Sequence, residues 1–566
     1  MSLTIVRRPV PAWAGTLVDA GLSPVLARIY AARGISSVAE LDHGVAALPS
    51  FESLKDIDRA AERLVRAIDD HERIVIVADY DADGATACAV GVLGLRAMGA
   101  QVDFVVPNRF EFGYGLTPEI VTQAAQLAPR LLVTVDNGIA SCDGVAAAVA
   151  RGIDVLVTDH HLPGAQLPAP AIIVNPNQLG CAFPSKNIAG VGVMFYVLLA
   201  LRARLRQLGR FAASTEPNLA ELLDLVALGT VADVVRLDQV NRILVEQGLR
   251  RMRAGRARPG VRALFEVAGR DAARATPGDL GFVAGPRLNA AGRLADMSLG
   301  IRCLLASSMD EALPLARELD RLNQARREVE TDIHDQAIAA LEQAGAAATD
   351  ESYSLCMFGD DWHQGVVGIV ASRLKDRYHR PTVVFAKSSD GELKGSGRSI
   401  PGFHLRDALD LVDKRAPGTV RRFGGHAFAA GVSIAAAHFD RFAATFEAVA
   451  RELLTPSQLR QALESDGPLA AGELHFRLAE DLAWRVWGQG FAAPAFDDTF
   501  TVTDQRIVAE KHARLTLNRG GERFEAMAFR QPDPLPARIS ALFRPEIHEW
   551  NGLRSLQLVI DHWQAA

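Results

Sequence analysis

The chain has little cysteine, and the few cysteines are not paired. No two of them have the CxxC spacing, so the sequence predicts neither a zinc site nor a disulfide framework. Unpaired thiols are typical of a reducing compartment, and we therefore expect a cytoplasmic protein. The five cysteines among the 566 residues are Cys88, Cys142, Cys181, Cys303 and Cys356.

Long apolar runs are also missing. The longest covers residues 188–201 and has 14 residues, whereas a membrane-spanning helix needs about 20. This run predicts a buried helix instead. The first residues lack the apolar core of a secretory signal peptide, and we expect no association with a membrane.

A strong excess of one charge is the third missing feature. The chain has 61 Lys and Arg against 67 Asp and Glu, a net charge of −6, with 49% hydrophobic and 23% charged residues. This balance is that of an ordinary globular protein and excludes binding to nucleic acid through an overall basic surface. One local exception covers residues 250–293, which contain ten arginines and three acidic residues.

The sequence is rich in carboxylates and histidines that directly follow short apolar runs. Such runs are typical of buried parallel strands. In an open α/β sheet the functional site lies outside the carboxyl ends of the strands, so we expect these groups to share one crevice. The three runs, 74–78, 131–135 and 155–158, lead into Asp79, Asp81 and Asp83, into Asp136, and into Asp159, His160 and His161, respectively.

A divalent cation explains this concentration of negative charge. Burying several carboxylates is costly unless cations neutralise them, and oxygen and imidazole ligands without thiolates favour Mn²⁺ or Mg²⁺. The alternative is an exposed acidic turn like the start of an EF-hand loop. An EF-hand requires glutamate at its twelfth position, and that position here is Val90.

The spacing of Asp79, Asp81 and Asp83 allows two geometries. If the chain stays extended, the three side chains share one face. If the chain turns at Gly84, they spread around a loop.

The pattern of elements predicts an α/β chain with four parts. Residues 1–240 combine a helical lead-in, up to about residue 60, with alternating strands and helices that favour a parallel sheet. Residues 241–348 contain the arginine-rich segment and a long helix from Met309 to about Ala344, which we expect to start or kink at Pro314. Ser308 and Glu311 have capping-box spacing at its start.

The remaining two parts differ from each other. Residues 349–455 form a second, glycine-rich α/β pattern. Residues 456–566 have alternating strand signals at 499–502, 515–517 and 556–560, which predict a small antiparallel barrel.

Several motifs resemble those of the DHH phosphoesterase superfamily. The resemblance implies a parallel-sheet DHH domain, a long connecting helix, a DHH-associated α/β domain and a C-terminal OB-like β-barrel. Two further segments, 107–115 and 285–293, are similar to those of its bacterial single-strand-specific DNA exonucleases. The superfamily motifs here are Asp79-Tyr80-Asp81-Ala82-Asp83-Gly84, Val135-Asp136-Asn137-Gly138, Asp159-His160-His161, Gly229-Thr230-Val231-Ala232-Asp233 and Gly424-Gly425-His426-Ala427-Phe428-Ala429-Ala430-Gly431.

The resemblance also implies a centre for two divalent metal ions, Mn²⁺ or Mg²⁺. Asp81 and Asp136 would hold one ion. The other would bind Asp83, Asp136, His160 and Asp233, with Asp136 as the bridge. Asp79, His161 and Asp136 are the expected catalytic residues. Asp79 and His161 are each a ligand or a residue that orients ligands, and His161 is alternatively a contact to the scissile phosphate.

Two basic segments are candidate nucleic-acid contacts. Arg109 and Tyr114 lie in a stretch that combines one arginine with three aromatic residues, as suits phosphates and unpaired bases. Arg287, Asn289 and Arg293 could all reach one strand if their glycine-flanked segment is irregular. The alternatives are aromatic core residues in the first case and general arginine enrichment in the second.

A glycine-rich strip in the second α/β pattern is a further candidate. In the strip 394–399, backbone N–H groups could approach a phosphate closely, and the family resemblance implies that Ser396 and Arg398 grip the strand or its 5′ end. His426 would complete that grip. A histidine between small residues is otherwise a structural hydrogen-bonding residue.

The function implied by the resemblance is processive 5′→3′ hydrolysis of single-stranded DNA to 5′-mononucleotides in recombination, mismatch repair and base-excision repair. One alternative is a DHH oligoribonuclease or cyclic-dinucleotide phosphodiesterase, which the extra C-terminal domain disfavours. Another is a non-catalytic single-strand-binding scaffold. The expected partners are single-stranded DNA, single-strand-binding protein and a RecQ-type helicase, and we expect a monomer.

Overall fold

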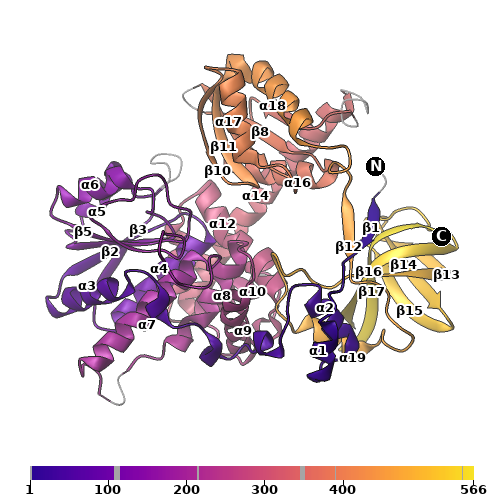
Figure 1. Ribbon diagram of the computed structural model, residues 1–566, viewed down its shortest axis with the longest axis horizontal. Coiled ribbons are helices and arrows are strands. Elements are labelled where there is room, and N and C mark those ends of the chain that lie inside the picture. The colour runs from indigo at the N-terminus through magenta and orange to yellow at the C-terminus, as the bar shows by residue number, and fades with distance from the viewer. Residues whose placement is uncertain (1–2, 108–114, 213–215, 344–350, 389–390, 551) are drawn as a thin grey trace. The chain divides into compact units, whose positions relative to one another are not determined.

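The computed structural model describes residues 3–107, 115–212, 216–343, 351–388, 391–550 and 552–566 (Figure 1). The chain forms two compact units. One contains residues 7–321 and 464–566, and the other contains residues 1–6 and 322–463.

A five-stranded, fully parallel sheet organises the first unit. The strands are β2 (Arg73–Ala78), β3 (Gln101–Val105), β4 (Leu131–Val135), β5 (Asp154–Thr158) and β6 (Ile172–Val174). Their order is β3-β2-β4-β5-β6. The chain places β3 on one side of β2 and β4 on the other, so the crevice of this sheet lies at the carboxyl ends of β2 and β4.

Helices cover both faces of this sheet (Figure 1). One face packs against α5 (Pro118–Ala125) and α6 (Cys142–Val149), and the other against α3 (Ile57–Asp69), α4 (Ala82–Ala97) and α7 (Gly190–Gln207). Both faces of each strand are therefore buried, which explains why the strands are apolar throughout. The longest apolar run lies in α7, as predicted for a buried helix.

The predicted helical lead-in is only partly helical. The strand β1 (Thr4–Arg7) precedes α1 (Ala14–Asp19) and α2 (Pro24–Ala31), and three 3₁₀ turns follow. Arg8 and Arg33 bind the buried carboxylate of Asp466 from the last hundred residues, with N–O distances of 3.2 and 2.7 Å. The start of the chain thus depends on partners that local sequence patterns do not reveal.

A set of helices continues the first unit beyond the sheet. They are α8 (Leu223–Ala232), α9 (Gln239–Arg253), α10 (Pro259–Glu266), α11 (Pro277–Asp279), a π-helical turn (Leu280–Ala284), α12 (Gly285–Leu294) and α13 (Ser298–Leu305).

The predicted long helix is α14 (Met309–Gln343). It does not start at Pro314. The Ser308 hydroxyl accepts a hydrogen bond from the Glu311 N–H, and the Glu311 carboxylate accepts one from the Ser307 N–H. These side chains cap the N–H groups ahead of the proline, so the helix begins five residues before it.

A mixed five-stranded sheet organises the second unit, in the order β10-β11-β9-β8-β7. Its core lies between the sheet and α17 (Leu405–Arg415) and α18 (Phe439–Leu453) on one face, and α16 (Val367–Tyr378) packs on the other. The strands are β7 (Leu355–Gly359), β8 (Thr382–Lys387), β9 (Glu392–Arg398), β10 (Val420–Gly425) and β11 (Ala429–Ala435).

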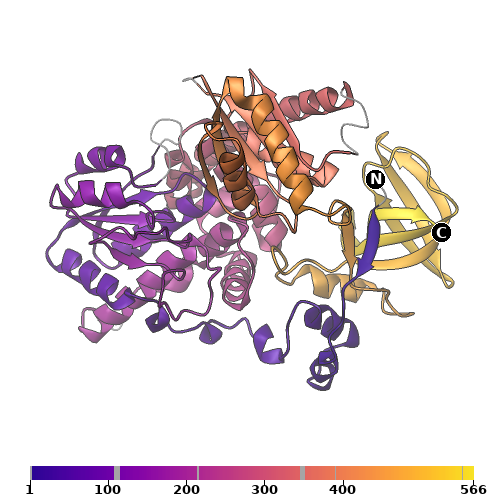
Figure 2. The same cartoon turned by 45° about the horizontal axis from the view of Figure 1, so that its top comes forward.

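A closed five-stranded barrel follows β12 (Ala462–Ser465) and α19 (Phe476–Ala483), and its strands wrap around one another in Figures 1 and 2. The three predicted strand signals lie in β13, β14 and β17, which confirms the barrel, but the barrel is not wholly antiparallel, because β15 and β17 pair in parallel. Aromatic and aliphatic side chains such as Phe496, Phe500 and Phe543 fill it. The strands are β13 (Phe496–Val508), β14 (His512–Arg519), β15 (Glu522–Ala528), β16 (Arg538–Trp550) and β17 (Leu553–Ala565).

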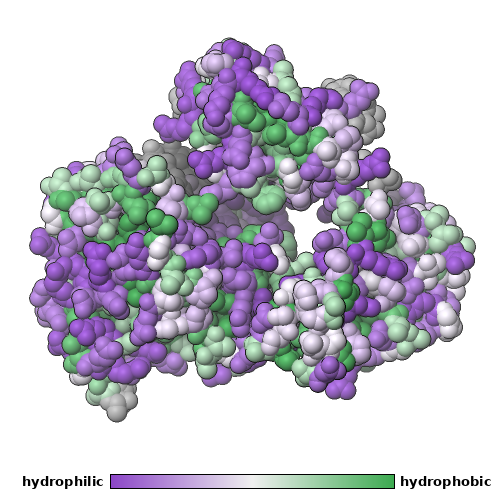
Figure 3. Space-filling view, viewed as in Figure 1, coloured by the Kyte–Doolittle hydropathy of each residue, from purple (hydrophilic) through white to green (hydrophobic). Residues whose placement is uncertain are grey.

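Hydrophilic side chains, interspersed with apolar patches, cover much of the face presented in Figure 3. Among the described residues, no helix combines the length and the apolar character that crossing a membrane requires.

Candidate metal centre

Seven carboxylate and imidazole side chains meet at the carboxyl ends of β2, β4 and β5. They form three groups whose ligand atoms lie within 4.8 Å of one another. Asp136 and His160 each belong to two of the groups, and together they link all three. The groups are Asp79, Asp81 and Asp136; Asp83, His160 and Asp233; and Asp136, His160 and His161.

The segment after β2 turns into a helix instead of staying extended. Asp81 is the N-cap of α4, and its carboxylate accepts a hydrogen bond from the Gly84 N–H at 2.9 Å. Asp83 consequently lies in the first helical turn. The extended alternative is wrong, because the N-cap starts the helix before Gly84. A Cβ on Gly84 would lie 2.6 Å from the Asp79 carbonyl oxygen, so only glycine fits this tight turn.

The first turn of α7 holds the Asp83 carboxylate. Its two oxygens accept hydrogen bonds from the N–H groups of Gly190 at 2.6 Å and Val191 at 2.9 Å. The positive end of a helix dipole also favours a carboxylate at this place. Even so, burial and the nearby Asp81 charge raise the pKa of Asp83 to about 7.

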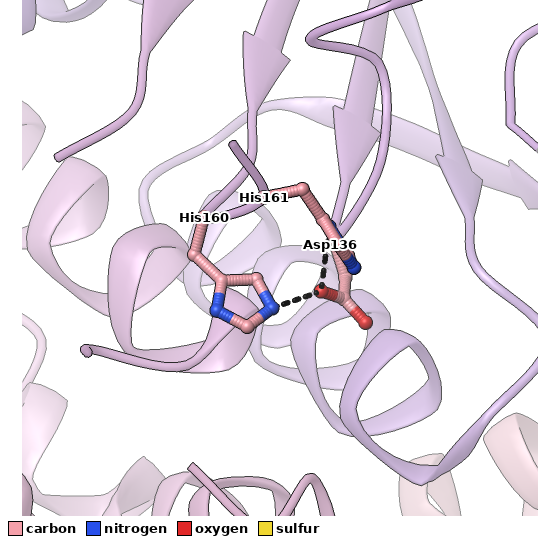
Figure 4. Close-up of side chains that lie close together, drawn as sticks. All are labelled: Asp136, His160 and His161. Carbon is pink, nitrogen blue, oxygen red and sulfur yellow. Dashed lines mark ion pairs between the residues drawn. The ribbon is translucent and has the colours of Figure 1, made fainter. Parts of the chain in front are cut away.

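Asp136 and His160 occupy the middle of the centre (Figure 4). The Nε2 atom of His160 lies 3.1 Å from Asp136 Oδ1 and 3.5 Å from Asp233 Oδ2. Asp136 adopts a left-handed backbone conformation with φ of 61°. This conformation is unfavourable for most residues but well tolerated by Asp and Asn, so aspartate suits this position for both its backbone and its carboxylate.

The electrostatics of the centre favour a bound cation. Burial, together with repulsion between neighbouring carboxylates, raises the pKa values of Asp79, Asp136 and Asp233 well above the usual range. The donors are carboxylate oxygens and an imidazole nitrogen, without a thiolate. Hard divalent cations such as Mn²⁺ and Mg²⁺ suit this set, and they would relieve the repulsion between the carboxylates.

Asp159 orients His161, a role that the motif alone does not reveal. Its carboxylate is buried and accepts hydrogen bonds from the N–H of Ile139 and from Nδ1 of His161, the latter at 2.7 Å. Burial lowers the pKa of His161, but the hydrogen bond and the charge of Asp159 outweigh it and raise that pKa to about 9. A buried aspartate directly before two histidines is the only sequence signal for this pairing.

Residues 285–293, which carry three predicted nucleic-acid contacts, form part of the helix α12, so the expectation of an irregular segment is wrong. On α12, Asn289 and Arg293 are four residues apart and share one side, whereas Arg287 points elsewhere. Arg287 is buried and pairs with Asp320 at 2.8 Å. Asn289 accepts a hydrogen bond from the Ala82 N–H at 2.8 Å and so touches the turn that carries Asp81 and Asp83.

The other predicted nucleic-acid contacts lie in the second unit or outside the described residues. Ser396 and Arg398 alternate along β9 and share one face, where the Arg398 guanidinium donates a hydrogen bond to the Ser396 hydroxyl at 3.0 Å. His426 directly follows β10 and is exposed. Arg109 and Tyr114 fall within 108–114, outside the residues that the structure describes.

Three family models match separate parts of the chain. They are described as the DHH family N-terminal domain at residues 73–230, the DHHA1 domain at 350–452 and the RecJ OB domain at 465–562. Together they agree with the predicted DHH domain, associated domain and barrel.

Relatives cover the whole chain. The single-stranded-DNA-specific exonuclease RecJ of Dickeya dadantii is 50% identical over 567 residues, which cover 98% of each protein. Crystal structures of Thermus thermophilus RecJ with Mn²⁺ and with Mg²⁺ match with TM-scores of 0.83 and 0.78, at 30% and 29% identity. Both cover 100% of this chain, and they match 79% and 78% of the Thermus chains, respectively.

Proposed function

The chain belongs to the RecJ family of single-stranded-DNA-specific exonucleases, and from that premise we propose that it hydrolyses single-stranded DNA in the 5′→3′ direction. The reaction is processive and releases 5′-mononucleotides, in the service of DNA recombination and repair. The observation that carries the proposal is the position of Asp136, which joins two groups of metal-binding side chains at the mouth of the parallel sheet.

Two divalent cations, Mn²⁺ or Mg²⁺, bind in this centre. We assign Asp81 and Asp136 to one cation, and Asp83, Asp136, His160 and Asp233 to the other. When bound, a pair of cations polarises the scissile phosphate and lowers the pKa of an attacking water molecule.

The remaining residues of the centre position these groups. Asp159 bonds to Nδ1 of His161 and fixes the ring, so Nε2 is the atom that faces the scissile phosphate. Asp79 accepts a hydrogen bond from the Tyr80 N–H at 2.8 Å and stiffens the turn that leads to Asp81. His161 and Asp79 thus keep the phosphate and the metal ligands in position, and a misplaced phosphate or ligand slows the reaction steeply.

Charged and polar residues in both units bind the strand. Arg109, Tyr114 and Arg293 contact the strand, and Ser396, Arg398 and His426 grip the strand or its 5′ end. Arg287 and Asn289, predicted as contacts from the sequence, support binding indirectly in this proposal. Arg287 is already paired with Asp320, and Asn289 bonds to Ala82.

The enzyme works in the cytoplasm as a monomer, together with single-strand-binding protein and a RecQ-type helicase. The match of the C-terminal residues to the RecJ OB domain disfavours an oligoribonuclease or a cyclic-dinucleotide phosphodiesterase. The full set of candidate metal ligands disfavours a non-catalytic scaffold.

The test is digestion of 5′-labelled and 3′-labelled single-stranded DNA with Mn²⁺ by the wild type and by Asp136→Asn. Asparagine keeps the shape and the left-handed backbone but removes the bridging charge. We expect early release of labelled mononucleotide from the 5′ end only, and none from the variant. Release from the 3′ end would refute the polarity, and an active variant would refute the bridging role of Asp136.

A further inference from the structure

Three of the most exposed apolar side chains among the described residues lie on segments that carry a candidate metal ligand or pack against one of these segments. Phe282 is 80% exposed, Val234 is 62% exposed and Leu162 is 61% exposed. Single exposed apolar residues are common on protein surfaces. Three of them on segments that carry candidate metal ligands or pack against such a segment call for a specific explanation.

Leu162 and Val234 are joined to the centre through the backbone. Leu162 directly follows His161, and Val234 directly follows Asp233. The side chains of His160 and Asp233 approach to 3.5 Å, so the two segments meet at the centre.

Phe282 belongs to a turn that packs against the second of these segments. It lies on the π-helical turn Leu280–Ala284, which packs against α8 just before Asp233. A Cβ on Gly281 would lie 3.3 Å from the Val231 side chain, and one on Gly285 would lie 3.0 Å from Ala232. The glycines on either side of Phe282 therefore contact the last turn of the helix that leads into Asp233.

Val234 and Phe282 both have an unusual backbone conformation. Val234 has φ of 63°, a left-handed conformation that is unfavourable for a β-branched residue. Phe282 lies in a π-helical turn, a rare geometry that is frequent at functional sites. Neither residue buries its side chain in return for the unfavourable backbone.

We propose that Leu162, Val234 and Phe282 form an apolar rim that contacts the faces of unpaired nucleobases as a strand enters the metal centre. Nucleobases in a duplex stack on their neighbours and have no face to offer, whereas those of a single strand do. The rim therefore adds a selective attraction for single strands next to the reacting phosphate. This inference rests on the proposed function, and it assigns to these residues part of the single-strand preference.

The experiment compares two single-stranded oligonucleotides of equal length, one with thymine bases and one with abasic sites at its 5′ end. The ratio of kcat/KM for the two substrates measures the contribution of the bases. Since aromatic stacking is sensitive to truncation, we expect Phe282→Ala to lower this ratio by about five- to a hundredfold, while Phe282→Trp preserves it. Hydrolysis of the abasic strand should stay at the wild-type rate.

Leu208→Ala is the matched control. Leu208 is 43% exposed and lies at the far end of α7, about 27 Å along the helix from the turn that holds Asp83. This control should keep the wild-type ratio. An unchanged ratio in Phe282→Ala, or an equal loss on both substrates, would overturn the rim.

A binding measurement separates this inference from the proposed function. With Ca²⁺ in place of Mn²⁺, the Phe282→Trp variant should show a fluorescence change on adding the thymine strand that exceeds those of the wild type and of the abasic strand. If the wild type digests neither strand, the proposed function fails. In that case the fluorescence difference alone tests the rim, and its absence would refute the proposed contact with the bases.

Discussion

Replacing Gly190 by alanine tests the geometry of the metal centre with one methyl group. Gly190 is the first residue of α7, and its N–H binds Asp83. A Cβ at this position would lie 2.6 Å from Oδ1 and 2.7 Å from Cβ of Asp136. The added methyl group therefore collides with the residue that links the metal-binding groups.

The size of the effect follows from these distances. Non-bonded carbon atoms prefer a separation of about 3.5–4.0 Å, so Asp136 or the start of α7 must move by about 1 Å. Overpacking of this kind costs about 1–3 kcal/mol of stability. A displacement of about 1 Å in a catalytic group lowers the rate by about a hundredfold.

The assay combines DNA hydrolysis, calorimetric Mn²⁺ binding and thermal unfolding of the Gly190→Ala variant. Gly15→Ala is the control, because Gly15 also lies in a helix, but its added Cβ would have nothing within 4 Å. We expect a folded Gly190→Ala protein with weakened Mn²⁺ binding and a rate reduced about a hundredfold. Wild-type activity and Mn²⁺ affinity in this variant would refute the described contact between α7 and Asp136.

Four further predictions concern the metal centre and the residues around it. Asp159→Asn should lower nuclease activity by about 10–100-fold, because His161 loses the charge that orients it; steady-state kinetics measure this, and an unchanged kcat would contradict it. Arg287→Met should destabilise the fold by about 1–3 kcal/mol in urea unfolding, because it removes the guanidinium that pairs with the half-buried Asp320 carboxylate at 2.8 Å; a loss of DNA affinity at unchanged stability would instead favour direct contact. EDTA should abolish hydrolysis, and Mn²⁺ should restore it. The pKa of Asp83 is raised to about 7, so the folded, metal-free protein keeps a proton that the unfolded chain releases near pH 4. The stability that this proton contributes is lost as the pH rises through 7. The increase in Tm caused by Mn²⁺ should therefore be larger at pH 7.5 than at pH 5.5, and an equal increase would contradict this.

The sequence predicted the features that depend on local patterns. A short apolar run predicts a buried strand without information from other parts of the chain. The polar residues that follow such runs could therefore be placed at one edge of the sheet. Asp81 and Asp136 were expected in one crevice for this reason, whereas their assignment to one cation came from the family resemblance. The long α14 was also predicted, because its apolar periodicity and the capping residues Ser308 and Glu311 are local signals, although Pro314 does not mark its start.

Features that depend on distant contacts could not be predicted. The N–H groups that hold Asp83 belong to Gly190 and Val191, more than a hundred positions along the chain. The glycines around Arg287 favoured an irregular segment, whereas here small residues allow α12 to pack closely: a Cβ on Gly292 would collide with the Tyr80 carbonyl oxygen. Glycine is required both for close packing and for an irregular backbone, and only the tertiary structure shows which of the two applies.

The ion pairs between the start of the chain and Asp466 have a consequence for the order of events during synthesis. Arg33 leaves the ribosome 433 residues ahead of its partner. At about 5–20 residues per second, it waits about 20–90 s for that carboxylate. The parallel sheet has all its strands by residue 174 and can form during this interval. The contacts of Arg8 and Arg33 with Asp466 are therefore made late, after all the segments that carry candidate metal ligands have been synthesised.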